Sequence, residues 1–351
     1  MRSLRIGYWP LSPNLKSAGD RRRLVFWARV RGHTIVTDLD QKIDVIVASE
    51  NSDFNSKYFT QRGVPVIFDL VDAYLSPRNS IDDIARGIAK GFSGQISGHL
   101  KPFSNHVRDF CIKANSVICS SVEQEALIAP YNLNTHVILD SHEELPFLDP
   151  PIYPNNAENK HRILWEGQPA TIRGIKSISQ ALSEVSSNIQ FELDFVTDIK
   201  FFQLLNKYVE RDTMKVLEKD LGQIANLANI IPWSPNNLVK SAKNSDLAVI
   251  PLDLSVPIQN LKPENRLLIM WRLGIPCLTS PSPAYARVAR QSGASVVCDS
   301  LSNWSVSIKR LLNDSNFAHN EIVMGQNYLR EYHTRGILLK KWDLAFESVI
   351  G

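Results

Sequence analysis

The sequence predicts an α/β protein with two doubly wound, Rossmann-like domains that face each other across a cleft. Short apolar runs rich in β-branched residues alternate with helical patterns through both halves of the chain. The 351 residues exceed one average domain. A stretch rich in proline, asparagine and acids, residues 141–161, separates the halves and is the expected linker.

The first half, residues 1–140, is expected to form one domain around a parallel sheet. Its strands are the apolar runs bounded by turn residues, which cover 4–9, 33–38, 44–49, 65–70, 115–121 and 135–140. Helices are expected between these strands, one beginning near Asp20 and others over 54–62, 80–92, 98–114 and 121–131. This alternation places helices on both faces of the sheet.

The second half, residues 162–315, repeats this organisation and is expected to form the second domain. Its strands are predicted at 162–167, 189–196, 229–233, 246–251, 275–280 and 295–299. Helices are predicted at 172–187, 212–228, 236–243 and from Lys262 to Gly274. The apolar positions of residues 316–351 predict a terminal helical stretch, which either returns to the first domain or covers the second.

Composition excludes several classes of protein. The net charge of +3 is small for this length, so strong nucleic-acid binding is not expected. The four cysteines show no metal-ligand spacing and are expected to be buried thiols in a reducing compartment. No apolar run reaches the roughly 18 residues of a membrane span. The expected location is the cytoplasm, either free or peripherally at the inner face of the membrane.

The segment from Asp246 to Pro281 has the clearest place for an anion. It reads as a buried strand, a loop, a helix and a second strand. A helix N-terminus offers unpaired N–H groups and partial positive charge, so Lys262, Asn265 and Arg266 are candidates to hold phosphate or sugar hydroxyls.

This segment resembles the donor site of GT-B-type glycosyltransferases, especially those of bacterial surface-polysaccharide pathways. The shared features are a strand ending in Asp, apolar residues and Pro, a loop, and a helix ending in Gly-Ile-Pro. Many retaining members carry two glutamates eight residues apart here, where this chain has Leu261 and Ile269. The resemblance implies a nucleotide-sugar donor bound by the second domain and an acceptor bound by the first, without a metal or cofactor.

The resemblance extends to residues 165–178, where the family uses two cations to neutralise the donor diphosphate. Gly167 and Arg173 fall on this pattern, whereas Gln168 replaces the first cation. Lys176 is a candidate to compensate for that loss.

Two further residues are candidates for donor binding. Trp233 follows a predicted strand, where it either stacks on the base or packs in the core. Asp253 follows the strand that ends at Pro251, where it either binds sugar hydroxyls or caps the loop.

The first strand-to-helix connection carries a glycine loop that the family uses near donor phosphate and acceptor. Gly19, Asp20 and Arg22 are therefore donor-binding candidates. The alternative is a helix cap at Asp20 followed by a solvated basic face.

Asp69 and Asp72 lie at the end of the strand at 65–70 and are the catalytic candidates. A carboxylate beyond a strand's carboxyl end can take the proton from an acceptor hydroxyl. Asp72 is preferred because Asp69 still lies within the strand run, and either residue could instead be a cap or turn residue. The only Asp-x-Asp pattern, Asp38 and Asp40, is expected to be a solvated turn rather than a metal site.

The predicted function is metal-independent transfer of a sugar from a nucleotide-activated donor to a hydroxyl of a glycan or lipid-linked acceptor in surface polysaccharide synthesis. Two alternatives remain open. An inactive glycan-binding or scaffold subunit would explain the missing glutamates, and a nucleotide-sugar epimerase would share the architecture.

Overall fold

The computed structural model describes residues 2–60, 63–76, 83–84, 87–88, 90, 101–151, 160–203 and 209–351. The chain divides into two compact units. Unit 1 comprises Met1–Glu143, Leu261–Pro263 and Thr334–Gly351. Unit 2 comprises Glu144–Asn260 and Glu264–His333.

Unit 1 is built on a six-stranded parallel sheet with the strand order β2-β1-β3-β4-β5-β6. The strands are β1 (Arg5–Trp9), β2 (Thr34–Val36), β3 (Val45–Ser49), β4 (Val66–Leu70), β5 (Ser116–Cys119) and β6 (Thr135–Val137). The strand order reverses between β1 and β3. In open parallel sheets, such a reversal opens a crevice outside the carboxyl ends of the strands, where ligands bind.

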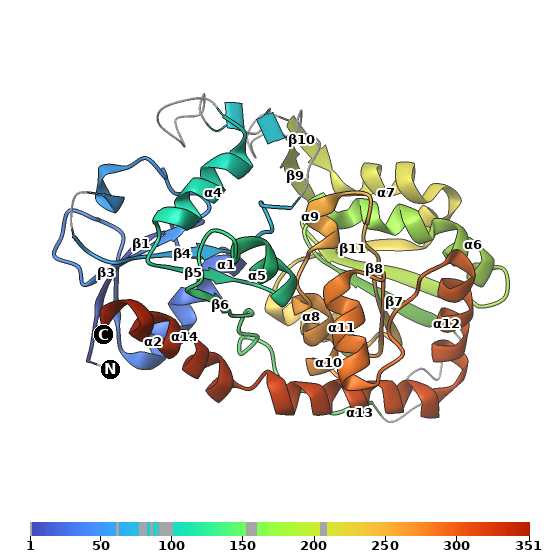
Figure 1. Ribbon diagram of the computed structural model, residues 1–351. Helices are drawn as coiled ribbons and strands as arrows, with labels where there is room; N and C mark the ends of the chain where they lie inside the picture. Colours follow the sequence, from blue (N-terminus) through green and yellow to red (C-terminus); the bar gives the residue numbers. More distant parts are fainter. Residues whose placement is uncertain are drawn as a thin grey trace. The chain divides into compact units, whose positions relative to one another are not determined.

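Helices cover both faces of this sheet. They are α1 (Ala18–Arg21), α2 (Leu24–Arg31), α4 (Phe103–Lys113), α5 (Val122–Ile128) and α14 (Arg335–Ile350). The C-terminal helix α14 lies beside α2 (Figure 1), where the indole of Trp27 stacks on Trp342 with ring centroids 5.9 Å apart. On the other face Phe110 of α4 packs edge-on against Phe68 of β4. Residues 334–351 therefore contribute to the core of unit 1.

A buried ion pair fastens the first helices of unit 1 to the sheet. Arg23, the residue before α2, donates from Nη2 to Asp69 Oδ1 over 2.6 Å. The same guanidinium donates to the carbonyl of Ile138 over 2.6 Å and lies 3.4 Å from Asp140. The side chains of Arg23 and Asp69 are 0% and 2% exposed. Each charge is therefore compensated by the other rather than by water.

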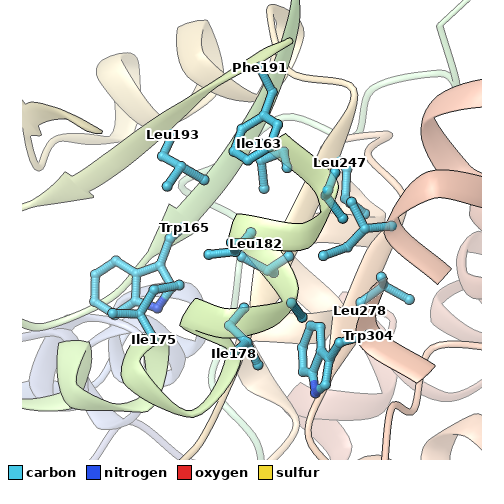
Figure 2. Packing of buried hydrophobic residues seen from close by; sticks show 14 of the residues in the cluster. Ile163, Trp165, Ile175, Ile178, Leu182, Phe191, Leu193, Leu247, Leu278 and Trp304 are labelled. Atoms are coloured by element: carbon cyan, nitrogen blue, oxygen red, sulfur yellow. The ribbon is translucent and has the colours of Figure 1, made fainter. Parts of the chain in front are cut away.

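Unit 2 is built on a five-stranded parallel sheet with the order β11-β8-β7-β12-β13. The strands are β7 (His161–Glu166), β8 (Phe191–Thr197), β11 (Ala228–Pro232), β12 (Leu247–Ile250) and β13 (Cys277–Thr279). This is a doubly wound order, and the reversal lies between β7 and β12. Figure 2 shows the apolar core on one face, where Trp165 and Phe191 from the sheet meet Leu182 and Trp304 from the helices.

The helices of unit 2 follow its strands in the expected alternation. They are α6 (Ser179–Ser186), α7 (Thr213–Leu221), α8 (Pro235–Lys243), α9 (Pro257–Asn260), α10 (Asn265–Arg272), α11 (Pro283–Ser292), α12 (Leu301–Asn313) and α13 (Ser315–Tyr332). The 3-10 helices are η1 (Lys57–Phe59) in unit 1, and η2 (Pro169–Ile178) and η3 (Gly222–Leu227) in unit 2.

Three local expectations were wrong, and one element was missed. Of the helix predicted at 54–62, the described residues 54–60 form only the single turn η1. Phe54, which precedes this turn, packs on Phe68. The helix expected from Lys262 begins at Asn265, with Glu264 as its N-cap. The strand expected at 295–299 is an isolated bridge between Thr279 and Val297. An antiparallel hairpin, β9 (Lys200–Gln203) and β10 (Val209–Asp212), was not predicted.

Part of the predicted linker, residues 141–161, is fixed to unit 2. The backbone N–H of Leu148 donates to Arg272 of α10 over 2.9 Å, and Arg272 Nε donates to Leu145 over 2.8 Å. Gln326 of α13 donates to the carbonyl of Leu148 over 2.7 Å. Residues 152–159 of that linker, and most of the helix predicted at 80–92, lie outside the described residues.

Candidate functional site

The loop after β1 is organised by Asp20. Its carboxylate accepts hydrogen bonds from the hydroxyl of Tyr8 over 2.6 Å, the backbone of Leu11 over 2.8 Å, and the backbone and hydroxyl of Ser12. The hydroxyl of Ser17 donates to it as well. Asp20 is fully buried and its oxygens are occupied. The carboxylate therefore shapes the loop from within, and the geometry does not support its predicted contact with a donor.

Gly19 lies in α1 and Arg22 is the C-cap of this helix, so both adjoin the loop that Asp20 orders. A Cβ at Gly19 would lie 2.3 Å from Leu11 Cδ1, so glycine lets the loop fold onto α1. Arg22 is buried, and its carbonyl accepts from the backbone N–H of Ser141 over 2.8 Å.

Asp69 lies in the core of unit 1. Its side chain is 2% exposed and is held by Nε and Nη2 of Arg23. The sequence interpretation of Asp69 as a general base is not supported by this geometry, because the carboxylate is committed to the ion pair.

Asp72 lies just beyond β4 and remains accessible. Its side chain is 25% exposed, and Oδ1 accepts from Lys262 Nζ over 2.5 Å. Its backbone carbonyl accepts from Gln124 Nε2 of α5 over 3.1 Å, which fixes the chain after the strand. Lys262 was predicted to lie with the anion-binding helix, but residues 261–263 belong to unit 1, where this lysine faces a carboxylate.

A second carboxylate, Glu50, adjoins Asp72 and was missed in the sequence. Glu50 directly follows β3, the neighbour of β4, and accepts the backbone N–H of Asp72 on Oε2 over 3.1 Å. Burial first, and then the negative charge of Asp72, raise the pKa of Glu50 to about 7, against the lowering effects of the Asp72 N–H hydrogen bond, Lys90 and Lys262. The rule that singled out Asp72, a carboxylate just past a buried strand, would have found Glu50 too.

In unit 2, Arg266 lies at the reversal of the strand order. Its guanidinium carbon lies 5.3 Å from the ring centroid of Trp165, and Nη1 donates to Thr171 Oγ1 over 3.3 Å. Its Nε and Nη2 atoms are buried and have no hydrogen-bond partner among the described residues. A Cβ at Gly167 would lie 2.8 Å from Arg266 Nη1, so this glycine lets the guanidinium approach the backbone after β7.

The loops after β7 and β12 are in close contact at the same edge. A Cβ at Gly174 would lie 2.2 Å from the carbonyl oxygen of Pro251, which follows β12. Glycine at 174 therefore permits this approach. The helix α10, which carries Arg266, begins without a side-chain cap for its first N–H groups.

Trp233 and Glu166 are joined across the end of the sheet. The indole N–H of Trp233 donates to Glu166 Oε1 over 2.9 Å, which orients a half-buried ring just after β11. Glu166, the last residue of β7, was not singled out in the sequence.

The remaining donor-binding candidates differ in their surroundings. Arg173 and Lys176 are exposed on η2, and Asn265 is the half-buried first residue of α10. Asp253 accepts from the backbone N–H of Ser255 over 3.2 Å and from its hydroxyl over 2.5 Å. Asp253 therefore also closes a local turn, the alternative that the sequence left open.

Asp38 and Asp40 are exposed in a turn, where Asp38 Oδ1 accepts the backbone N–H of Asp40 over 3.1 Å. Across the described ranges, no group of three or more His, Cys, Asp and Glu side chains is arranged to hold a metal ion. In that same part of the chain, none of the helices combines the length and apolar character needed to span a bilayer.

Neither a protein-family model nor a curated protein matches this sequence. Solved structures do resemble it. The glycosyltransferase WaaG, described as involved in lipopolysaccharide biosynthesis, has a TM-score of 0.58 at 12% identity over 99% of this chain and 100% of its own. An E. coli protein described as trehalose-6-phosphate bound with UDP-2-fluoro glucose has a TM-score of 0.55 at 10% identity over 88% of this chain and 74% of its own.

TarM has a TM-score of 0.60 at 11% identity and covers 86% of this chain. This chain spans about half of TarM, 54% of its length. At these identities the likeness establishes the fold. The predicted fold class is confirmed: the chain has the GT-B fold of two Rossmann-like α/β domains.

Proposed function

We propose that the protein is a glycosyltransferase that moves a sugar from a nucleotide-activated donor to a hydroxyl of a glycan or lipid-linked acceptor. The observation that carries this proposal is the half-buried Arg266 at the strand-order reversal of unit 2, whose Nε and Nη2 atoms are buried and have no hydrogen-bond partner among the described residues. Buried N–H groups of a cation that lack hydrogen-bond partners are costly, whereas a bound anion would satisfy them.

The surroundings of Arg266 favour a phosphate group as that anion. Two nitrogens of one guanidinium can hold two phosphate oxygens in a planar, bidentate arrangement. The uncapped N–H groups at the start of α10 add donors and partial positive charge. The close approach at Gly167 brings backbone to the same place.

Other residues of unit 2 complete the donor site in this proposal. Arg173 and Lys176 supply exposed cations for the remaining diphosphate charge. Trp233, oriented by Glu166, offers a ring face for stacking the base. Asn265, the first residue of α10, and Asp253 bind the sugar hydroxyls in this proposal.

Unit 1 supplies the general base in this proposal. Asp72 accepts the proton of the acceptor hydroxyl while the oxygen attacks the anomeric carbon, and the nucleotide leaves with the bonding electron pair. Gly19 in α1 and Arg22, the C-cap of α1, lie in the connection that follows β1. The loops after β1 and β3 are linked by the hydrogen bond from Asn51 Nδ2 to Leu11, which keeps the carboxyl edge of the sheet ordered.

We further propose that the reaction belongs to surface polysaccharide synthesis, with a peripheral membrane location. The fold likeness to WaaG supports this setting, because that protein is described as acting in lipopolysaccharide biosynthesis. The structure described with UDP-2-fluoro glucose supports a nucleotide sugar as the donor class.

The donor site is tested by the Arg266→Met variant. Methionine keeps a long, unbranched side chain beside Trp165 and removes the charge. A hydrogen bond to a charged group contributes about 1.5–3 kcal/mol, so losing even one is expected to lower nucleotide affinity by at least roughly 10- to 150-fold. Isothermal titration calorimetry with the nucleotide that binds the unmodified protein measures this loss.

The matched control is Arg290→Met, which removes an exposed arginine from α11 of the same unit. Its nucleotide affinity is expected to stay unchanged. Equal Kd values for Arg266→Met and the unmodified protein would place the anion elsewhere and remove the main support for a donor site here.

A further inference from the structure

The ends of β3 and β4 carry a side-chain cluster that the proposed function does not yet use in full. Glu50 and Asp72 follow neighbouring parallel strands, so their side chains emerge at the same edge of the sheet. We propose that Glu50 is a positioning residue that holds Asp72 through its backbone N–H and forms with it a coupled carboxylate pair, which controls the basicity of Asp72.

The hydrogen bond between the two residues fixes where the Asp72 carboxylate points. Glu50 Oε2 accepts the Asp72 N–H over 3.1 Å, while Gln124 donates to the carbonyls of Leu70 and Asp72 from the other side. Both backbone groups of Asp72 are therefore held. With its backbone fixed, the side chain can meet Lys262 in a constant geometry.

The groups facing Glu50 come from several elements. Tyr74 points its hydroxyl toward Oε1 at 3.5 Å, and Lys90 donates to the Glu50 carbonyl over 3.2 Å. Lys90 also lies over the ring of Phe103, 4.0 Å from its centroid, which keeps its ammonium group beside the cluster. Glu50 is buried, whereas Asp72 and Lys262 are partly exposed. Glu50 is thus the inner member of the pair and Asp72 the outer member, the one placed to meet a ligand.

Coupling follows from this arrangement. Two neighbouring carboxylates raise each other's proton affinity, because the second charge is created near the first. The pKa of Glu50 is raised to about 7, by burial first and then by the charge of Asp72. Above that pH, the ionised Glu50 makes Asp72 a stronger base. Below it, protonation of Glu50 removes this charge while keeping the carbonyl oxygen that accepts the Asp72 N–H.

The direct test follows the titration of Glu50 by carbon-13 NMR in protein labelled at glutamate carboxyl groups. The Glu50→Gln variant assigns the resonance by its loss. The titration midpoint of the Glu50 carboxyl group is expected near pH 7 in the unmodified protein. In Asp72→Asn it is expected to move toward the ordinary pKa of 4.5. An Asp38→Asn control, altered at an exposed turn, should leave it unchanged. If the Glu50 midpoint were the same in Asp72→Asn and in the unmodified protein, the proposed interaction between the two carboxylates would be wrong.

The second test concerns catalysis and rests on the proposed function. In the unmodified protein, kcat/KM, measured by the release of nucleotide, should decrease as the pH is lowered below about 7. Glu50→Gln keeps an oxygen for the Asp72 N–H but never ionises, so this step should vanish. The maximal kcat/KM of Glu50→Gln should be roughly three- to tenfold lower than that of the unmodified protein, as expected if Asp72 becomes a weaker base by up to about one pKa unit. Glu50→Ala should be slower still, since the hydrogen bond is lost.

The two tests separate the possible failures. A Glu50→Gln enzyme with an unaltered rate and an unaltered acid step would show that Glu50 only supports the fold, and would overturn the inference. A shifted Glu50 midpoint in Asp72→Asn, without turnover of any nucleotide sugar by the unmodified protein, would uphold the pair and reject the transferase proposal.

Discussion

Replacing Asp72 with asparagine is expected to lower glycosyl transfer by about 10²- to 10⁴-fold, the usual contribution of a general base. Asparagine has nearly the same shape, and its amide oxygen can still accept from Lys262. The variant cannot take up a proton from the acceptor. Steady-state kinetics with a saturating donor measure the loss in kcat, and calorimetry should show donor affinity within about twofold because the donor is assigned to unit 2.

The control for this experiment is Asp38→Asn, in the exposed turn of unit 1 that also resembles a metal-binding pattern. It should retain full activity. Turnover preserved in Asp72→Asn would remove Asp72 from the mechanism and leave the accessible carboxyl edge of unit 1 without its assigned base.

Replacing Arg23 with methionine is expected to destabilise the protein by about 3–5 kcal/mol, the cost of breaking a buried ion pair from one side. The substitution leaves Asp69 buried beside Asp140 without its cation, and the carbonyl of Ile138 loses its donor. Urea denaturation followed by circular dichroism measures the change in the free energy of unfolding.

Arg29→Met is the matched control, since Arg29 is exposed on α2, the helix that Arg23 precedes. A surface substitution of this kind should change stability by less than about 0.5 kcal/mol. If both variants unfold at the same urea concentration as the unmodified protein, the Arg23–Asp69 pair does not hold α2 to the sheet.

The sheets were predictable because buried parallel strands are short apolar runs that carry their own signal. Four of the runs read as strands, 44–49, 65–70, 162–167 and 246–251, appear as β3, β4, β7 and β12. The helix at 54–62 failed because its apolar residues, such as Phe54, serve the core of unit 1 from an irregular segment. Local periodicity cannot distinguish these two uses of an aromatic residue.

The candidate site was less predictable because long-range pairing decides which charged groups are available. Asp69 and Asp72 look equivalent in the sequence, yet only Asp69 is taken up by Arg23, 46 residues away. Lys262 lies four residues before Arg266 but bonds to Asp72, 190 residues away. Glu50 gains its significance from the adjacency of β3 and β4, which only the strand order reveals.

The most direct test of the account is a thermal-shift panel with UDP, GDP, dTDP, CMP and ADP on the unmodified protein and on Arg266→Met. A nucleotide that binds the folded state raises Tm, and a concentration of 100 times Kd stabilises by about 2.7 kcal/mol. We expect one nucleotide of the panel to raise the Tm of the unmodified protein and to have a much smaller effect on Arg266→Met. If none of the five nucleotides raised the Tm of the unmodified protein, and calorimetry also showed no binding, the assignment of a nucleotide-sugar site would be contradicted. An inactive glycan-binding subunit would then be favoured.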